Sequence, residues 1–279
     1  MTSEIKNICN RIENLMTLYH ENNHDLLYEK TLIELQSVNF NGIFINLNNL
    51  TLHRVRLNNV KDEIFENIEE LHYAPQKCVC SFGRVNRPGQ SMFYCSEFSS
   101  ICDLELLHDY LLKNDIGHER LATYSEWEIK TDLDILILAI APSNREFVNG
   151  LAIRNDCIDF VKTKPESTHE TYCNFYSLTS HFFEKNAKNN YSVYVVCSAI
   201  ANYFTLQFPN IDGLIYPTVQ GNIGYNIVLR PHVLDNKMII PKKEVFVQKW
   251  IITNKNSMTI DNNFHKIGRI KKDKIIWTY

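Results

Sequence analysis

The chain has 279 residues, of which 44% are hydrophobic and 22% are charged, and its formal net charge is −3. This composition is ordinary for a globular protein, and the length suits one large domain or two small ones. A protein that binds nucleic acid directly usually carries a basic excess, so the net charge argues against that class of partner. The longest apolar run, residues 133–141, is too short to span a bilayer, and the polar N-terminus does not resemble a signal peptide.

The cysteine pattern favours free thiols. None of the eight cysteines forms a C-x-x-C pair, and the only close pair, Cys78 and Cys80, lacks a second pair at zinc-finger spacing. Several cysteines lie in apolar runs, where this residue behaves as a small hydrophobe. Disulfides or a metal site are less favoured, so we expect a protein of the reducing cytoplasm without a bound metal.

The first part of the chain is predicted to be helical. Apolar residues recur at helical spacing from Ile5 to Tyr19, and the pattern resumes at Leu26 after a polar break. We therefore divide the chain into an N-terminal helical extension, residues 1–47, and a main domain, residues 48–279.

The main domain mixes strands and helices. Strands are predicted at 51–57, 90–96, 123–129 and 134–141, and on both sides of the glycine-containing loop within 211–231. Helices are predicted at 60–75, from Ser99 or Ser100 onward, at 167–185 and at 191–207. The tail from residue 244 is rich in β-forming residues, with turn residues at 261–263. Strict βαβ alternation and the glycine-rich phosphate motifs are both absent, so the predicted fold class is α+β.

Four arginines are candidates for binding an anion. Arg54 and Arg56 share one face of a strand, because side chains at i and i+2 point the same way. Arg84 and Arg87 lie in the loop before the next strand, and guanidinium groups bind phosphate oxygens in a bidentate manner. The alternative for each is a solvated surface arginine.

Three other positions leave two interpretations open. Tyr94 ends an apolar strand, and it is either a core aromatic or a ring that stacks on a planar cation. Glu105 lies beside an apolar helix stripe, and it is either a boundary residue or a partly buried carboxylate that stabilises positive charge. Thr218 lies close before two glycines, and this segment is either a hairpin with a loose turn or a place where a ligand approaches the backbone.

Taken together, the segments resemble one known family. The order is "HRVR", then "GRVNRPGQSMFYCSE" leading into "DLELL", then "YSVYVVCSAIANYF", then "NIDGLIYPTVQGNIGYNIVLRP". This order resembles the RES domain family over roughly residues 52–231, whereas the first 45 and last 45 residues match nothing we can name. Matched position by position, the family's site residues are Arg54, Arg84, Tyr94, Glu105, Thr218 and Asn226. Thr218 departs from the family serine: it keeps the hydroxyl but adds a methyl group and stiffens the side chain.

The resemblance implies a fold similar to the ADP-ribosyltransferase toxins, with a split mixed sheet around an NAD cleft. It implies that residues 48–279 form a catalytic domain that cleaves the nicotinamide–ribose bond of NAD by phosphorolysis or hydrolysis, with inorganic phosphate as a possible co-substrate and no other cofactor. Glu105, Arg54 and Thr218 would be catalytic.

In the same resemblance, Arg54 and Arg84 would hold the diphosphate, Tyr94 would pack on the nicotinamide or its ribose, and Asn226 would hydrogen-bond the ligand. The expected partner is an antitoxin or an immunity protein, and a helix-turn-helix domain is typical of the antitoxins of this family. Two alternatives stay open: an ADP-ribosyltransferase that modifies a macromolecule, and an inactive NAD-binding module.

Overall fold

The computed structural model describes residues 1–19, 23–58, 63–103, 106, 110, 114–139, 157, 159–187, 190–219, 224–254 and 257–278. These residues form a mixed α+β fold with one large sheet, which confirms the predicted fold class. The helices are α1 (Ser3–Leu18), α2 (His24–Leu35), α5 (His169–Phe183), α6 (Ser192–Gln207) and α7 (Pro231–Asp235), with 3-10 helices η1 (Ile68–Leu71), η2 (Gln76–Cys78) and η3 (Glu166–Thr168). The strands are β1 (Ile43–Leu47), β2 (Thr51–Leu57), β3 (Phe93–Ser96), β4 (Glu119–Ile129), β5 (Leu133–Ile137), β6 (Gly213–Pro217), β7 (Tyr225–Leu229), β8 (Ile239–Asn254), β9 (Ser257–Lys271) and β10 (Lys274–Thr278).

The sheet has two halves that meet at a single residue pair. Its strand order is β1-β5-β6-β7-β3-β2-β4-β8-β9-β10, and neighbouring strands are antiparallel except β5 and β6. The strands β2 and β3 are in register only at His53 and Ser96, whereas β2 pairs with β4 along its whole length. The first half of the sheet consists of β1, β5, β6, β7 and β3, and the second half consists of β2, β4, β8, β9 and β10. The pairing of β3 with β2 that joins them is the narrowest contact in the sheet.

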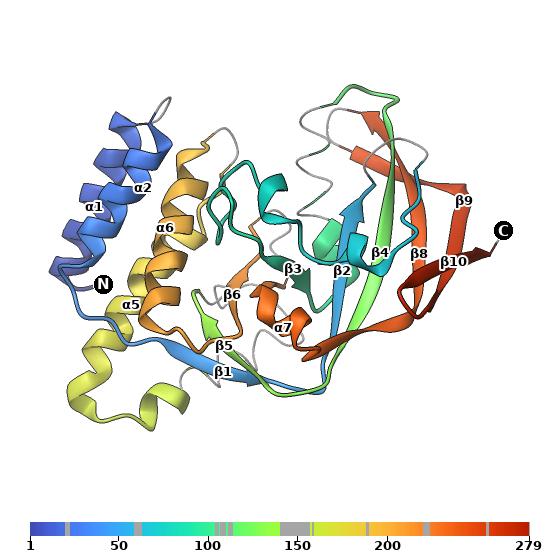
Figure 1. The fold of residues 1–279 in the computed structure, drawn as a ribbon. Helices are drawn as coiled ribbons and strands as arrows, with labels where there is room; N and C mark the ends of the chain where they lie inside the picture. The colour runs from blue at the N-terminus through green and yellow to red at the C-terminus, as the bar shows by residue number, and fades with distance from the viewer. Residues whose placement is uncertain are drawn as a thin grey trace.

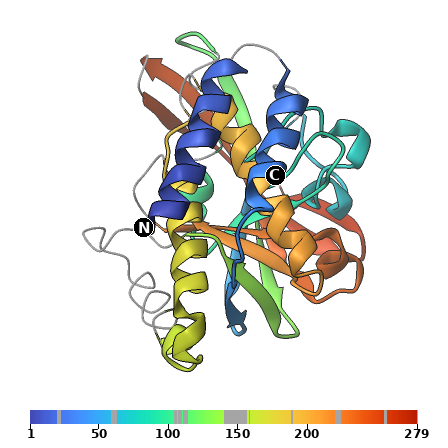
Figure 2. The same cartoon turned by 90° about the vertical axis from the view of Figure 1, so that its left-hand side faces the viewer.

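Four helices cover the first half of the sheet. Figure 2 looks onto this side, where α1, α2, α5 and α6 stand in front of the strands. Their apolar side chains share one core with β5 and β6, and α1 contributes Ile5, Ile8 and Ile12, whose spacing follows the helical period. The helices predicted in the first part of the chain (α1 and α2), at 167–185 (α5) and at 191–207 (α6) are confirmed. The strand β1 lies within the segment 1–47 and pairs with β5, so that segment also supplies an edge of the sheet.

The second half of the sheet curls back on itself (Figure 1). The outer edge of β10 bonds to the segment before η1, because the backbone N–H of Ile275 donates to Glu66 O at 2.8 Å and that of Ile68 donates to Asp273 O at 3.0 Å. A second core fills the curve and includes Phe65, Leu71 and Trp127, with Val245 and Ile275 from the hairpin strands.

Two predicted elements were wrong. The predicted helix at 60–75 is, over its described part, extended backbone with only the short η1, because residues 66 and 68 use their backbone groups to pair with β10. The turn predicted at 261–263 is a bulge inside β9: Gln248 pairs with His265 and Trp250 pairs with Ile260, so four residues of β9 lie opposite Lys249. No helix in the described part of the chain has the length and apolar character needed to cross a membrane.

Candidate functional site

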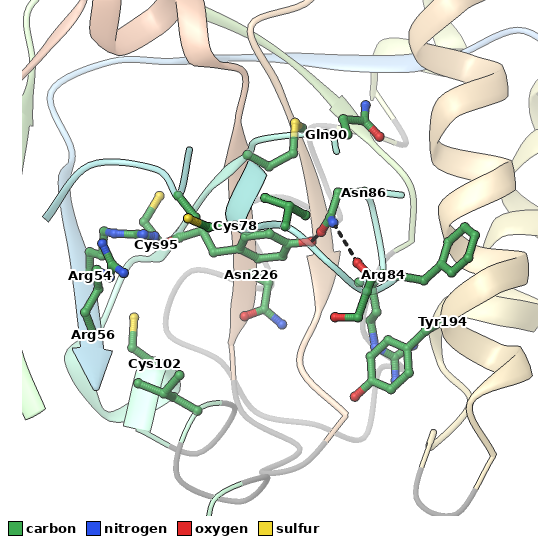
Figure 3. Close-up of a pocket in the computed structure, with 18 of the residues that line it drawn as sticks. Arg54, Arg56, Cys78, Arg84, Asn86, Gln90, Cys95, Cys102, Tyr194 and Asn226 are labelled. Atoms are coloured by element: carbon green, nitrogen blue, oxygen red, sulfur yellow. Dashed lines mark hydrogen bonds between the residues drawn. The ribbon is translucent and has the colours of Figure 1, made fainter. Parts of the chain in front are cut away.

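A pocket of about 580 Å³ lies where β2 and β3 separate. Its wall contains residues 54–57 of β2, Tyr94 and Cys95 of β3, and much of the loop from Cys78 to Met92. The volume falls in the range of small-molecule and cofactor sites. Figure 3 shows Arg54 and Arg56 at one end of the pocket, Arg84 and Tyr194 at the other, and Asn86 and Asn226 between them.

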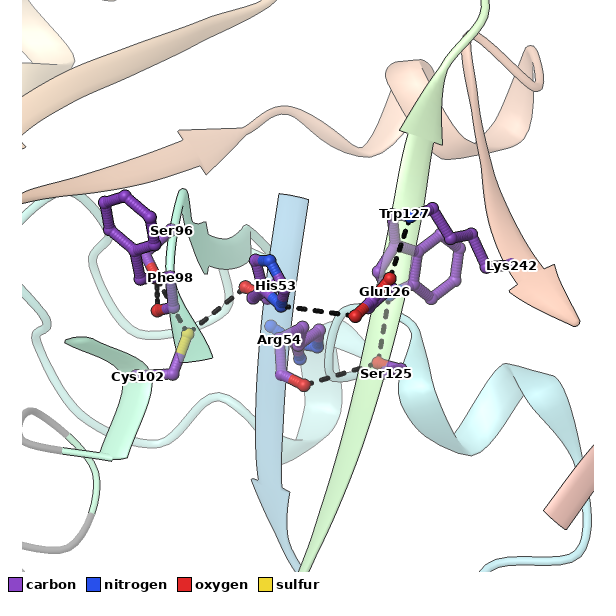
Figure 4. A network of polar contacts seen from close by, with 9 residues as sticks. All are labelled: His53, Arg54, Ser96, Phe98, Cys102, Ser125, Glu126, Trp127 and Lys242. Atoms are coloured by element: carbon purple, nitrogen blue, oxygen red, sulfur yellow. Dashed lines mark hydrogen bonds and ion pairs between the residues drawn. The ribbon is translucent and has the colours of Figure 1, made fainter. Parts of the chain in front are cut away.

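The junction of the two half-sheets is reinforced by a cysteine. The Sγ of Cys102 donates to His53 O of β2 at 3.2 Å and lies 3.1 Å from Ser96 Oγ of β3 (Figure 4). Burial raises the pKa of Cys102 to about 11, so the thiol stays protonated and able to donate. The segment after β3 is therefore bonded to both halves of the sheet at the edge of the pocket.

Arg54 spans the point where the two halves separate. Its guanidinium group donates to Leu71 O at 2.9 Å, to Tyr94 O at 2.6 Å and to His72 O at 3.0 Å. It also lies 4.5 Å from the ring centroid of Phe93. The bond to Tyr94 O joins β2 to β3 through a side chain where the backbone pairing has ended. The interpretation of Arg54 as a solvated surface residue is therefore wrong.

The Arg54 end of the pocket is positively charged. Arg54 is 8% exposed, and burial, followed by the charge of Arg56, lowers its pKa to about 10, so it stays charged at neutral pH. Arg56 donates to the carbonyl oxygen of Glu70. In the part of the chain that the structure describes, no carboxylate forms an ion pair with Arg54, and carbonyl dipoles and the face of the Phe93 ring compensate its charge. This end of the pocket therefore favours an anionic ligand.

Arg84 is held at the opposite end by the C-terminus of α5. Its guanidinium group donates to Lys185 O at 2.8 Å and to Phe183 O at 3.3 Å, and it lies 5.7 Å from the ring centroid of Tyr194. Carbonyl groups at a helix C-terminus carry partial negative charge, which explains this placement of a cation. Arg84 thus fixes α5 and the Tyr194 ring relative to the loop that carries it.

Tyr94 is oriented by a tight turn in that loop. Its hydroxyl donates to Asn86 Oδ1 at 2.6 Å, and the turn is closed by a bond of 2.9 Å from Gly83 N to Asn86 O. A Cβ atom on Gly83 would lie 2.4 Å from Asn86 Oδ1 and 2.8 Å from Tyr94 Oη, so only glycine fits there. Burial raises the pKa of Tyr94 well above its usual range, which keeps the hydroxyl protonated.

Asn226 brings a buried hydrogen-bond donor to the middle of the pocket. It lies on β7 between Ser96 of β3 and Tyr216 of β6, and its side chain is 7% exposed. Its Nδ2 atom has no hydrogen-bond partner among the described residues. A buried amide left without an acceptor costs about 1–3 kcal/mol, which a ligand oxygen at this point would recover.

Thr218 does not belong to the pocket wall as described. It follows β6 and is 1% exposed, and its backbone N–H donates to Gly224 O at 3.0 Å, which closes the loop between β6 and β7. Gly224 has a φ of +77°, and a Cβ there would lie 2.0 Å from Ile101 Cδ1. Tyr216, two residues before Thr218 in the sequence, does line the pocket.

The remaining candidates lie elsewhere or outside the described residues. Glu105 falls outside the residues that the structure describes. Arg87 is exposed and lies 6.0 Å from the ring centroid of Tyr28 of α2, away from the wall that holds Arg84. The described part of the chain holds no group of three or more His, Cys, Asp or Glu side chains that could bind a metal ion.

Sequence reasoning missed several residues of the pocket, among them Asn86, Tyr194 and Tyr216. Asn86 orients Tyr94, and Tyr194 and Tyr216 line the wall. The fixed spacing of Asn86 after Gly83 was a visible signal, because such a turn brings the two residues together. The two tyrosines lie in apolar segments, and nothing in their pattern distinguishes them from core aromatics.

Comparison with known proteins leaves the family open. No family model and no curated protein matches the chain. Among solved structures, the chain is similar to "Crystal structure of the M.tuberculosis MbcT-MbcA toxin-antitoxin complex", with a TM-score of 0.34 and 10% sequence identity. The similarity covers 87% of this chain and 93% of that chain. At this TM-score it carries no argument about the activity.

Proposed function

We propose that the protein binds NAD in the pocket between the two half-sheets and cleaves the nicotinamide–ribose bond, with water or inorganic phosphate as acceptor. The observation that carries this proposal is the presence in one pocket wall of Arg54, Arg84, Tyr94 and Asn226, which lie far apart in the sequence. These are four of the six site residues that the motif resemblance selects. The single-pair junction of the sheet also fits a split sheet of the ADP-ribosyltransferase type.

The chemistry of the pocket matches the parts of a dinucleotide. Its charged Arg54 end suits the diphosphate, and the Tyr94 ring offers a face for a planar group. The side-chain amide of Asn226, which has no partner among the described residues, offers a donor to a ribose or carboxamide oxygen. Arg54 and Arg84 would contact the nucleotide from opposite ends of the pocket rather than as two neighbouring groups (Figure 3). Thr218 would act on the ligand through the loop that it closes.

Bond cleavage builds positive charge on the ribose, as in glycoside hydrolysis. In the proposal, Glu105 faces that charge and stabilises it, which follows from the motif resemblance. Glu97 directly follows β3, lies near Gly224 and is 7% exposed. It provides a matched variant for testing the assignment.

The proposal includes a biological role. An enzyme that consumes NAD in the cytoplasm would arrest growth, and it would require an antitoxin as its protein partner.

The test is incubation of the purified protein with NAD, with and without inorganic phosphate, and identification of the products by liquid chromatography and mass spectrometry. Hydrolysis yields nicotinamide and ADP-ribose, whereas phosphorolysis yields nicotinamide and ADP-ribose 1″-phosphate. Glu105→Gln should lower turnover about 100- to 1,000-fold with little change in NAD affinity. Glu97→Gln should leave turnover unchanged.

Other outcomes select other functions. An ADP-ribose label on a protein or nucleic acid would identify a transferase. Calorimetric binding of NAD without turnover would identify an inactive binding module. A protein that neither binds nor consumes NAD would refute the proposal.

A further inference from the structure

The charge of the chain is concentrated at its C-terminal end. Residues 236–279 contain ten lysines and arginines against three acidic residues, a net charge of +7. Because the whole chain carries −3, residues 1–235 carry −10. Such an asymmetry is typical of a protein that presents one region to an anionic partner.

Three of the ten basic residues of this region, Arg269, Lys271 and Lys274, lie on one exposed face of β9 and β10. Along β9 and β10, alternate side chains point to opposite sides of the sheet. One side packs inward and includes the buried Gly268 and Ile275. The other side is exposed at every position and consists of Ile267, Arg269, Lys271, Lys274, Ile276 and Thr278, which we call the outer β9–β10 face. The two strands stand at the right-hand edge of the sheet in Figure 1.

The residues of the outer β9–β10 face form a continuous patch. Cross-strand register places Ile267 beside Thr278, Arg269 beside Ile276, and Lys271 beside Lys274. The two isoleucines are 44% and 49% exposed, which is high for large β-branched side chains that lie close together. The patch therefore combines exposed apolar side chains with three positive charges.

Like charges face each other within this patch. Lys271 lies directly opposite Lys274, and such a pair destabilises a sheet. Among the described residues, Glu244 forms an ion pair with the patch: its carboxylate lies 3.6 Å from Arg269, and both side chains are largely exposed. Lys274 donates to the amide oxygen of Asn67 at 2.7 Å, a neutral group that leaves its charge uncompensated. An anionic partner would relieve this repulsion.

We propose that the outer β9–β10 face docks an acidic polypeptide segment that carries apolar side chains between its carboxylates. Protein interfaces have an apolar centre and a polar rim, which matches two isoleucines flanked by basic residues. Nucleic acids present mainly phosphates and sugars to such a surface and would leave the isoleucines uncovered. Electrostatic complementarity would speed the encounter and make the binding sensitive to salt. This site lies on the second half of the sheet and does not depend on the proposed NAD chemistry.

The test measures binding of a fluorescein-labelled peptide of alternating glutamate and valine to the full-length protein by fluorescence anisotropy. The comparison probes are a peptide of alternating glutamate and serine, a single-stranded DNA of equal charge, and vesicles that contain phosphatidylserine. We expect the glutamate–valine peptide to bind at least about tenfold more tightly than each comparison probe, and salt to weaken it.

Charge-reversal variants locate the binding. The double variant Arg269→Glu/Lys271→Glu should bind the glutamate–valine peptide at least about tenfold more weakly than the wild type does. The control Lys6→Glu/Lys162→Glu changes the net charge by the same amount on exposed helical residues and should bind as the wild type does. Thermal melting confirms that both variants fold.

Four results would overturn the proposal. The first is a loss of peptide binding in the control variant equal to that in Arg269→Glu/Lys271→Glu. The second is binding of the glutamate–serine peptide as tight as that of the glutamate–valine peptide, and the third is tighter binding of DNA or vesicles than of the glutamate–valine peptide. The fourth is self-association of the protein that Arg269→Glu/Lys271→Glu abolishes. The last would identify the acidic remainder of a second copy as the occupant.

Discussion

Replacing Arg54 by lysine tests whether the guanidinium group joins β2 to β3 beside the pocket, as its hydrogen bonds indicate. Three bonds run from this group to the carbonyl oxygens of Leu71, His72 and Tyr94, over distances of 2.6 to 3.0 Å. A lysine keeps the positive charge but lacks the forked donor geometry, so it can replace about one of the three bonds. The two others are lost, and their carbonyl acceptors stay buried.

The expected cost is large. A hydrogen bond to a charged group contributes about 1.5–3 kcal/mol, so two lost bonds lower the free energy of unfolding by about 3–6 kcal/mol. A domain of this size loses roughly 2–4 °C in melting temperature for each kcal/mol, which predicts a fall on the order of 10 °C.

Urea denaturation followed by tryptophan fluorescence measures this change. The midpoint should fall while the slope of the unfolding free energy stays the same. Arg56→Lys is the matched control, because its guanidinium group makes one backbone contact, to Glu70 O, and is half-buried; it should cost about 1 kcal/mol. An Arg54→Lys protein that unfolds within 1 kcal/mol of the wild type would refute the structural role that we assign to Arg54.

Three further predictions concern the same region. Asn226→Leu should weaken ligand binding in calorimetry by about 1–3 kcal/mol without lowering the urea midpoint, because Nδ2 has no described partner to lose. Burial raises the pKa of Asp103 from its usual 3.8 to about 6, against a bond donated by Tyr124. At Asp103 the folded protein therefore binds more protons than the unfolded chain between these values, so the free energy of unfolding of the wild type should rise relative to that of Asp103→Asn as pH falls from about 6 to 4. The exposed thiols of Cys78 and Cys80 line the pocket, so bound ligand should slow their labelling by maleimide.

Each of these predictions has a control in the chain. Asn58→Leu should lower the urea midpoint, because its buried amide donates to Glu63 O at 2.7 Å and accepts from Thr123 at 2.8 Å. The Asp103→Asn variant is itself the control for the pH prediction, and an equal pH dependence of stability in the wild type and in this variant would contradict the assignment to Asp103. Cys173 is exposed on α5 outside the pocket wall, and its labelling rate should not respond to ligand.

The sequence was sufficient to predict elements whose local pattern agrees with their final packing. The helical period of α1 and the alternation of β2 predicted both elements, and the motif order selected four residues that reach one pocket. These features depend on contacts that a short window of sequence already encodes.

Long-range backbone pairing explains what could not be predicted. The partners of Arg54 are main-chain carbonyls from two other segments, and carbonyl positions leave no signature in residue types. The segment at 60–75 has a helical pattern, but its pairing with β10 comes from the far end of the chain. The bulge at Asp261 looked like a turn because the same small polar residues suit both.

The single-pair junction between β2 and β3 leaves side chains as the main connection between the two halves of the sheet. The core that contains Phe65 and Trp127 also contains Phe93 and Ile227 of the first half, and Arg54 donates to Tyr94 O across the junction. A ligand that touches Arg54 on one half and Asn226 on the other would add a further connection. Because few backbone bonds cross the junction, occupancy of the pocket should slow amide hydrogen exchange in the strands on both of its sides.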